Sequence, residues 1–214
     1  LPHRPERYAR PMRTLILAIA IAATTSLACA ASTWSTFIEQ AAELGPDARA
    51  AAEFLPEHAP KRDTDLPINL LLDNLRLAMQ ARAEFPWAAQ VPIDVFHNDV
   101  LPYAVFDETL EPWRAAMLER VRPIVAGATT ATDAAQRINR DLFDQLGVEY
   151  NTARSKTNQS PREAIAEGKA TCTGLSILLV SACRAAGIPA RAAGVANWAD
   201  KRGNHTWVEV YDNG

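Results

Sequence analysis

Cysteine is scarce in this chain, which has three among its 214 residues. Cys29 lies near an apolar N-terminal stretch, whereas Cys172 and Cys183 lie in a segment that reads as one helix. Eleven helical residues rise about 16 Å along the axis, but the Cα atoms of a disulfide lie within about 7 Å of each other. We therefore do not expect Cys172 and Cys183 to pair, which leaves two free thiols to consider as reactive groups.

Spaced metal ligands and an excess of positive charge are also missing. The sequence has four histidines but no C-x-x-C pair and no convergent ligand spacing, so neither a metal nor another cofactor is expected. Lys and Arg number 22 against 25 Asp and Glu, a net charge of -3, which argues against a nucleic-acid partner. A composition that is 48% hydrophobic and 22% charged is typical of a folded protein.

No apolar run is long enough to predict a stable membrane span. Leu15–Ala23 (LILAIAIAA) falls well short of the roughly 20 residues that a bilayer requires. It follows a short basic stretch and precedes an A-x-A site that ends at Ala30, the pattern of a secretory signal peptide over residues 1–30. We predict an exported protein, periplasmic or extracellular, that starts at Met12. Lipid attachment at Cys29 and a buried N-terminal helix are the alternatives.

The next hundred residues predict a helical region that prolines interrupt. We take residues 31–129 as this N-terminal region and expect residues 87–109 to be broken and irregular. Apolar residues at three-to-four spacing predict helices at Trp34–Phe54, Leu66–Phe85 and Leu110–Val121, and Thr132–Asp133 is predicted to cap a further helix that ends at Leu146.

A core with mixed secondary structure is predicted over residues 130–214. Its motifs are a capping box at Ser160, an apolar helix over Cys172–Ala186, and two strands over Ala190–Trp198 and His205–Tyr211. The fold class is therefore α+β, with a central cysteine-bearing helix packed against an antiparallel sheet.

Cys172 and His205 are the candidate catalytic residues. Cys172 stands at the start of the apolar helix, where the helix dipole and first-turn N–H groups favour a thiolate. His205 opens the last predicted strand, which returns the chain to the sheet beside that helix. A thiol and an imidazole placed in this way form an activated nucleophile. Cys183, in the middle of the helix, reads as a core residue.

Three motifs in order resemble the transglutaminase-like superfamily: GKATCTGLSILL, RAAGIPAR and HTWVEVY. The resemblance covers about residues 130–214 and implies a papain-like core in which Cys172 is the nucleophile and His205 its partner. It also implies an Asp on a strand that follows the one bearing His205. That position falls beyond Gly214, so we expect a longer natural core, and weak or no turnover from residues 1–214 alone.

Three other polar residues near these motifs are weaker candidates for orienting the histidine or binding an oxyanion. Asp212 precedes Asn-Gly and reads as a turn residue rather than as the acid that orients the histidine. Asn158 and Gln159 are possible donors to an oxyanion, although the backbone N–H of Cys172 is the better candidate.

The predicted function is cysteine-dependent acyl transfer on peptide or protein amides by an exported enzyme. Hydrolysis is favoured over transamidation, and the substrate is the only partner that the sequence implies. Two alternatives stay open: an inactive transglutaminase-like module that binds or assembles components of the cell envelope, and peptide deglycosylation on the same scaffold.

Overall fold

The structure, a computed structural model, describes residues 33–197 and 203–212. These residues form helices and two small sheets, an arrangement compatible with the predicted α+β class. The helices are residues 33–42, α2 (Pro46–His58), α3 (Ile68–Glu84), α4 (Ile93–Asp99), α5 (Trp113–Ile124), α6 (Ala131–Leu146), α7 (Pro161–Glu167) and α8 (Cys172–Ala185), with a short 3₁₀ turn at Ala88–Gln90. The strands are β1 (Glu149–Tyr150), β2 (Lys169–Ala170), β3 (Ala190–Val195) and β4 (His205–Val210).

Several helices before α7 differ from the prediction, and α5 begins and ends three residues later than expected. The single helix expected over Trp34–Phe54 is wrong: the first helix ends at residue 42, and Gly45, with a φ of 113°, precedes Pro46, which begins α2. The helix α4, within the segment expected to be irregular, was not predicted. The cap of α6 is Thr130, whose hydroxyl accepts from the N–H of Asp133 at 3.1 Å, and not the predicted Thr132–Asp133.

The helix starts and stops near the predicted site agree with the structure. Ser160 and Glu163 form the complete capping box of α7, and Gly168 ends this helix in the left-handed region. The helix α8 begins at Cys172 as predicted and ends at Ala185, one residue before the predicted end.

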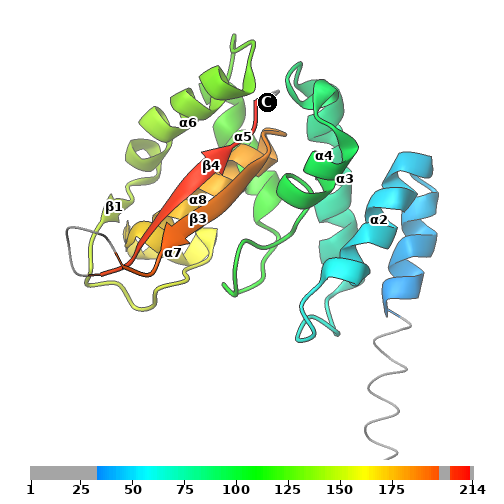
Figure 1. Ribbon diagram of the computed structural model, residues 1–214, viewed down its shortest axis with the longest axis horizontal. Coiled ribbons are helices and arrows are strands. Elements are labelled where there is room, and N and C mark those ends of the chain that lie inside the picture. The colour runs from blue at the N-terminus through cyan, green and yellow to red at the C-terminus, as the bar shows by residue number, and fades with distance from the viewer. Residues whose placement is uncertain (1–32, 198–202, 213–214) are drawn as a thin grey trace, which may run out of the picture.

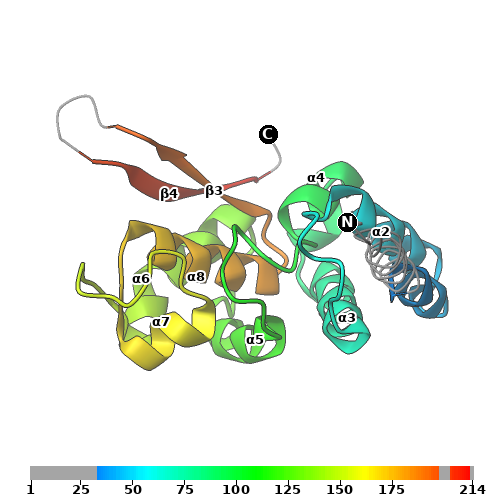
Figure 2. The ribbon, with the colours of Figure 1, turned by 90° about the horizontal axis from the view of Figure 1, so that it is seen from below.

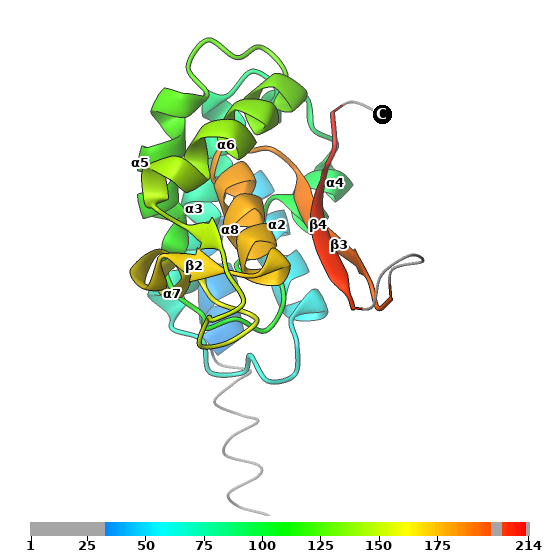
Figure 3. The same ribbon diagram turned by 90° about the vertical axis from the view of Figure 1, so that its left-hand side faces the viewer.

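The helix α8 lies in the middle of the core. Figures 2 and 3 show α5, α6 and α7 on one side of it and the β3–β4 hairpin on the other. Because both sides are covered, α8 is apolar almost all round, and Ile177, Leu178 and Val180 are fully buried. The helices that precede α5 pack as a second group beside this core (Figure 1).

The hairpin of β3 and β4 is antiparallel and pairs Val195 with His205 at the end next to the connecting loop. The strand β3 ends at Val195, so the predicted extension is wrong at residues 196 and 197, which form a bend, and its last residue, Trp198, lies outside the described residues. The strands β1 and β2 form a second, parallel pair in the register Tyr150 to Ala170. This short pair was not predicted, and it fixes the chain immediately before Cys172.

Among the described residues, none of the helices has the length and apolar character needed to cross a membrane. The predicted signal peptide over residues 1–30, its start at Met12 and the alternative lipid attachment at Cys29 lie outside the described residues.

Candidate active site

Cys172 is the first residue of α8, is only partly buried, and is a free thiol. The chain reaches it from β2, whose Ala170 is fully buried. Gly174, in the first turn, lets this approach come close, because a Cβ there would lie 2.9 Å from the Cβ of Ala170 and 3.1 Å from Oε1 of Gln159. The position of the thiol thus depends on tight packing between the first turn of α8 and the chain around it.

His205 is the first residue of β4 and is also partly exposed. Its imidazole stacks with the indole of Trp207, with ring centroids 6.1 Å apart. Its backbone is held opposite Val195 of β3, and Gly194 allows the two strands to approach, since a Cβ there would lie 2.7 Å from the carbonyl oxygen of His205. The hairpin register therefore fixes the backbone position from which the imidazole side chain extends.

One hydrogen bond connects the residues that follow the predicted nucleophile and base. The hydroxyls of Thr173 and Thr206 lie 3.2 Å apart, which joins the first turn of α8 to the start of β4. Because these threonines directly follow Cys172 and His205, the hydrogen bond keeps both elements together at the reactive end.

Cys172 and His205 line the same cleft, which has a volume of about 580 Å³. Its walls are one face of α8, one face of α6 and the strand β4. The residues of these walls are Cys172, Leu175, Ser176, Leu179 and Cys183 on α8, Thr132, Ala135, Gln136, Asn139 and Phe143 on α6, His205, Thr206, Trp207, Val208 and Val210 on β4, and Tyr150 of β1. We call this space the Cys172 cleft; its volume is in the range of small-molecule and peptide-side-chain sites.

The second thiol of α8 has a different environment. Cys183 is 1% exposed, and burial raises the pKa of its thiol to about 12. It lies eleven residues from Cys172 on the same helix face, at the far end of the cleft. A neutral, enclosed thiol is consistent with the predicted core role of Cys183.

Neither of the proposed oxyanion donors, Asn158 and Gln159, lines the Cys172 cleft. Gln159 is fully buried and donates to Glu167 at 2.7 Å and to the carbonyl of Lys169 at 3.1 Å. Asn158 donates to the carboxylate of Asp107. Both amides are engaged in holding the loop before α7, so the suggestion that either binds an oxyanion is not supported by this arrangement.

Asp212 has the structural role that its turn position suggested. Its carboxylate accepts from the backbone N–H of Thr132 at 3.0 Å, in the first turn of α6. A negative charge at this helix end is favourable. The contact attaches the end of β4 to the α6 wall of the cleft.

Sequence reasoning missed the α6 wall and the side chains that support the start of α8. The α6 residues Thr132, Ala135, Gln136, Asn139 and Phe143 recur at helical spacing, so the face was readable from sequence, but nothing local indicated what it faces. Arg154, which donates to the hydroxyl of Thr171 at 3.2 Å, carries no motif at all. Within residues 33–197 and 203–212, His, Cys, Asp and Glu form no group of three that could hold a metal ion.

Comparison with protein families bears on the part of the chain that forms this cleft. Residues 119–214 match the family model of the transglutaminase-like superfamily. The resemblance read from the three motifs is thereby confirmed, and the match begins earlier than expected, inside α5. Comparison with curated proteins and with solved structures gives no match. The transglutaminase-like stretch thus contains α6, α7, α8 and the hairpin, together with Cys172 and His205.

Proposed function

We propose that this protein is an exported cysteine-dependent acyl-transfer enzyme that acts on peptide or protein amides. One observation carries the proposal: Cys172 at the start of α8 and His205 at the start of β4 line one cleft, and the threonines that follow them are hydrogen-bonded. The transglutaminase-like superfamily generally includes enzymes, and residues 119–214 match it. In this proposal α8 and the hairpin form the centre of a papain-like core.

The reaction begins with the thiolate of Cys172, which attacks the amide carbonyl carbon. The carbonyl oxygen becomes an oxyanion at the first turn of α8, where the N–H of Cys172 and the helix dipole stabilise it. The imidazolium of His205 gives its proton to the leaving nitrogen, the C–N bond breaks, and a thioester remains on Cys172.

Release of the acyl group regenerates the thiolate. Water loses a proton to His205 and attacks the thioester carbonyl, the C–S bond breaks, and a carboxylic acid leaves. A second amine in place of water gives transamidation. The cleft is partly exposed at its reactive end, which gives water access, so we propose hydrolysis as the main outcome.

The walls of the cleft suit an extended peptide. Leu175, Leu179 and Val208 offer apolar surface beyond the thiol, and Gln136 and Asn139 of α6 offer side-chain amides that can donate to or accept from a peptide backbone. None of the α6 residues that line the cleft carries a charge, which argues for an uncharged substrate segment next to the scissile amide.

The test measures the reactivity of Cys172 in the full-length protein. The rate of iodoacetamide alkylation at Cys172, followed by peptide mass spectrometry as a function of pH, should have its midpoint well below about 8.5, the value of a free thiol. His205→Gln should raise that midpoint by at least one pH unit, whereas Cys183→Ala should leave it unchanged.

A peptide library then tests turnover. Wild-type protein should cleave amides and form a mass adduct on Cys172 that hydroxylamine removes, and Cys172→Ala should do neither. An ordinary thiol midpoint together with no cleavage would instead favour a binding module. Release of glycan from glycopeptides without cleavage of plain peptides would favour deglycosylation.

A further inference from the structure

Arg154 lies in the loop between β1 and α7 and reaches the residue before Cys172. Its Nε donates to the hydroxyl of Thr171 at 3.2 Å, its second nitrogen donates to the hydroxyl of Thr157 at 3.0 Å, and its third donates to the carbonyl of Thr152 at 3.2 Å. All three guanidinium nitrogens are used, so the side chain has one defined position against the start of α8.

The hydrogen bond from Arg154 prevents Thr171 from capping α8 in the usual way. Thr171 is the N-cap residue, and a threonine there ordinarily accepts from an N–H of the first turn. In α8 the Thr171 side chain makes no such capping bond, and its hydroxyl accepts from Arg154 instead. The first-turn N–H groups near Cys172 are therefore not occupied by the cap and stay available to an anion.

Within residues 33–197 and 203–212, no carboxylate forms an ion pair with Arg154, whose hydrogen-bond partners are two hydroxyls and a carbonyl. The acidic neighbour Glu167 bonds to Ser155 and Gln159, and lies 3.9 Å from Lys169. The other ionisable groups that line the cleft with the thiol are Tyr150, Cys183 and His205. The elements around it also carry Glu149 on β1, Arg184 on α8, Glu209 on β4, and Asp133, Arg137, Arg140, Asp141 and Asp144 on α6. Glu209 pairs with Arg191.

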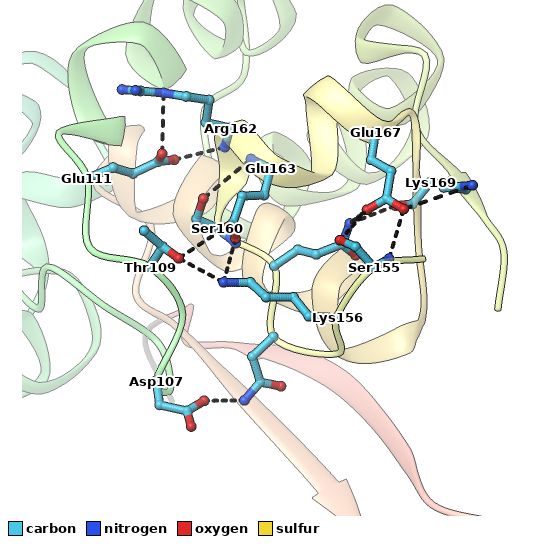
Figure 4. A network of polar contacts seen from close by, with 12 residues as sticks. Asp107, Thr109, Glu111, Ser155, Lys156, Ser160, Arg162, Glu163, Glu167 and Lys169 are labelled. Atoms are coloured by element: carbon cyan, nitrogen blue, oxygen red, sulfur yellow. Dashed lines mark hydrogen bonds and ion pairs between the residues drawn. The ribbon is translucent and has the colours of Figure 1, made fainter. Parts of the chain in front are cut away.

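The loop that carries Arg154 is fixed from outside by a polar network (Figure 4). Lys156 bonds to Thr109 at 2.7 Å and to Glu163 at 2.8 Å, and Asn158 bonds to Asp107. Asp107 and Thr109 belong to the segment before α5, so the N-terminal region holds one side of the loop. A guanidinium on an anchored loop is pre-organised for its contact with Thr171.

We propose that Arg154 is a positioning residue for the Cys172 nucleophile: it holds the N-cap of α8 away from the first-turn N–H groups and adds a positive charge that favours the thiolate. This inference rests on the proposed function, because it concerns how the same thiol is activated. Two effects stabilise the thiolate together. The first-turn N–H groups of α8 remain available to an anion, and the guanidinium of Arg154 places a positive charge close to the start of the helix.

The experiment compares the alkylation of Cys172 by iodoacetamide across pH 5 to 10 in the full-length protein and three variants. Arg154→Gln should raise the midpoint by about half a unit to one unit and slow alkylation at pH 7 about fivefold. Arg154→Lys keeps the charge but not the fork of donors, so it should recover part of the rate. Arg140→Gln, on the exposed part of α6 with Asp141 as its partner, should leave the profile unchanged.

Thermal unfolding and circular dichroism separate a change in reactivity from a failure to fold. If Arg154→Gln does not fold, Thr171→Val removes the hydroxyl that accepts from Arg154, and it should raise the midpoint by a smaller amount because the charge remains but is no longer held at the start of α8. A low midpoint in wild type that neither Arg154→Gln nor Thr171→Val changes overturns this inference alone. An ordinary thiol midpoint in wild type overturns the proposed function as well.

Discussion

The two thiols of α8 differ in what surrounds their sulfur atoms. Cys172 is partly exposed at the open end of the cleft, whereas Cys183 is 1% exposed and burial raises its pKa to about 12. A thiol with so high a pKa is almost entirely protonated at pH 8, and the protonated form is a poor nucleophile.

We therefore expect iodoacetamide at pH 8 to modify Cys172 at least roughly a hundred times faster than Cys183 in the folded protein. Peptide mass spectrometry measures both sites in one digest. In 6 M guanidinium chloride the two rates should become equal, because unfolding removes the burial. Equal rates in the native state would mean that α8 opens easily to solvent.

The carboxylate of Glu163 contributes to the stability of the folded protein in a way that depends on pH. Burial alone would raise its pKa, but the bonds from Lys156, from the backbone of Ser160 and from Thr109 outweigh this and lower its pKa to about 2, from an ordinary 4.5. A lowered pKa in the folded state contributes stability above about pH 4.5 that is lost as the pH falls toward 2.

Glu163→Gln should lower the free energy of unfolding at pH 7 by about 1 kcal/mol, a modest value because water screens this partly exposed ion pair. Urea denaturation at several pH values should show the difference from wild type shrinking as the pH falls from about 4.5 toward 2. Glu57→Gln, an exposed change on α2, provides the control. A difference that does not depend on pH would assign the loss to helix capping rather than to charge.

At the scale of elements, the first turn of α8 is placed by what it packs against. Gly174 is buried between Ala170 and Gln159, and a Cβ there would come within 2.9 Å of the Ala170 Cβ. Overpacking of this kind forces backbone shifts that cost about 1–3 kcal/mol. Any shift would move Cys172, two residues earlier.

Gly174→Ala should therefore lower the melting temperature and also slow alkylation of Cys172, even where the protein remains folded. The double variant Ala170→Gly/Gly174→Ala removes the methyl group on the other side of the clash and should recover part of the alkylation rate. Loss of stability with an unchanged alkylation profile would show that the first turn absorbs the methyl group without moving the thiol.

At the scale of the whole molecule, two buried arginines join the N-terminal helices to the core. Arg114 on α5 donates to Asn74 of α3 at 2.9 Å and to the carbonyls of Arg184 and Val100 at 2.8 Å each. Arg184 on α8 donates to the carbonyls of Asp99 and Ala104. Burial first, and then the charge of Arg184, lower the pKa of Arg114 to about 9, so it stays protonated at neutral pH.

Because these bonds join the helices that precede α5 to the core around α8, we expect the two groups to unfold together. Arg114→Met should lower the free energy of unfolding by about 3 kcal/mol, since it leaves buried carbonyls without donors. Calorimetry should show one transition at lower temperature. Arg120→Met, exposed on the same helix, should have little effect. Two separate transitions in wild type would contradict this coupling.

The sequence by itself determined the local features of the site. Ser160 with Glu163 sets where α7 begins, Gly168 sets where it ends, and the apolar run after Cys172 sets the extent of α8. Capping and periodicity depend on a few neighbouring residues, so they can be read locally. The tertiary structure alone decided what surrounds the thiol: the α6 wall, the bond between Thr173 and Thr206, and Arg154 at the N-cap. These contacts join residues far apart in the chain, so no local pattern encodes them, and they form only when the elements have packed together.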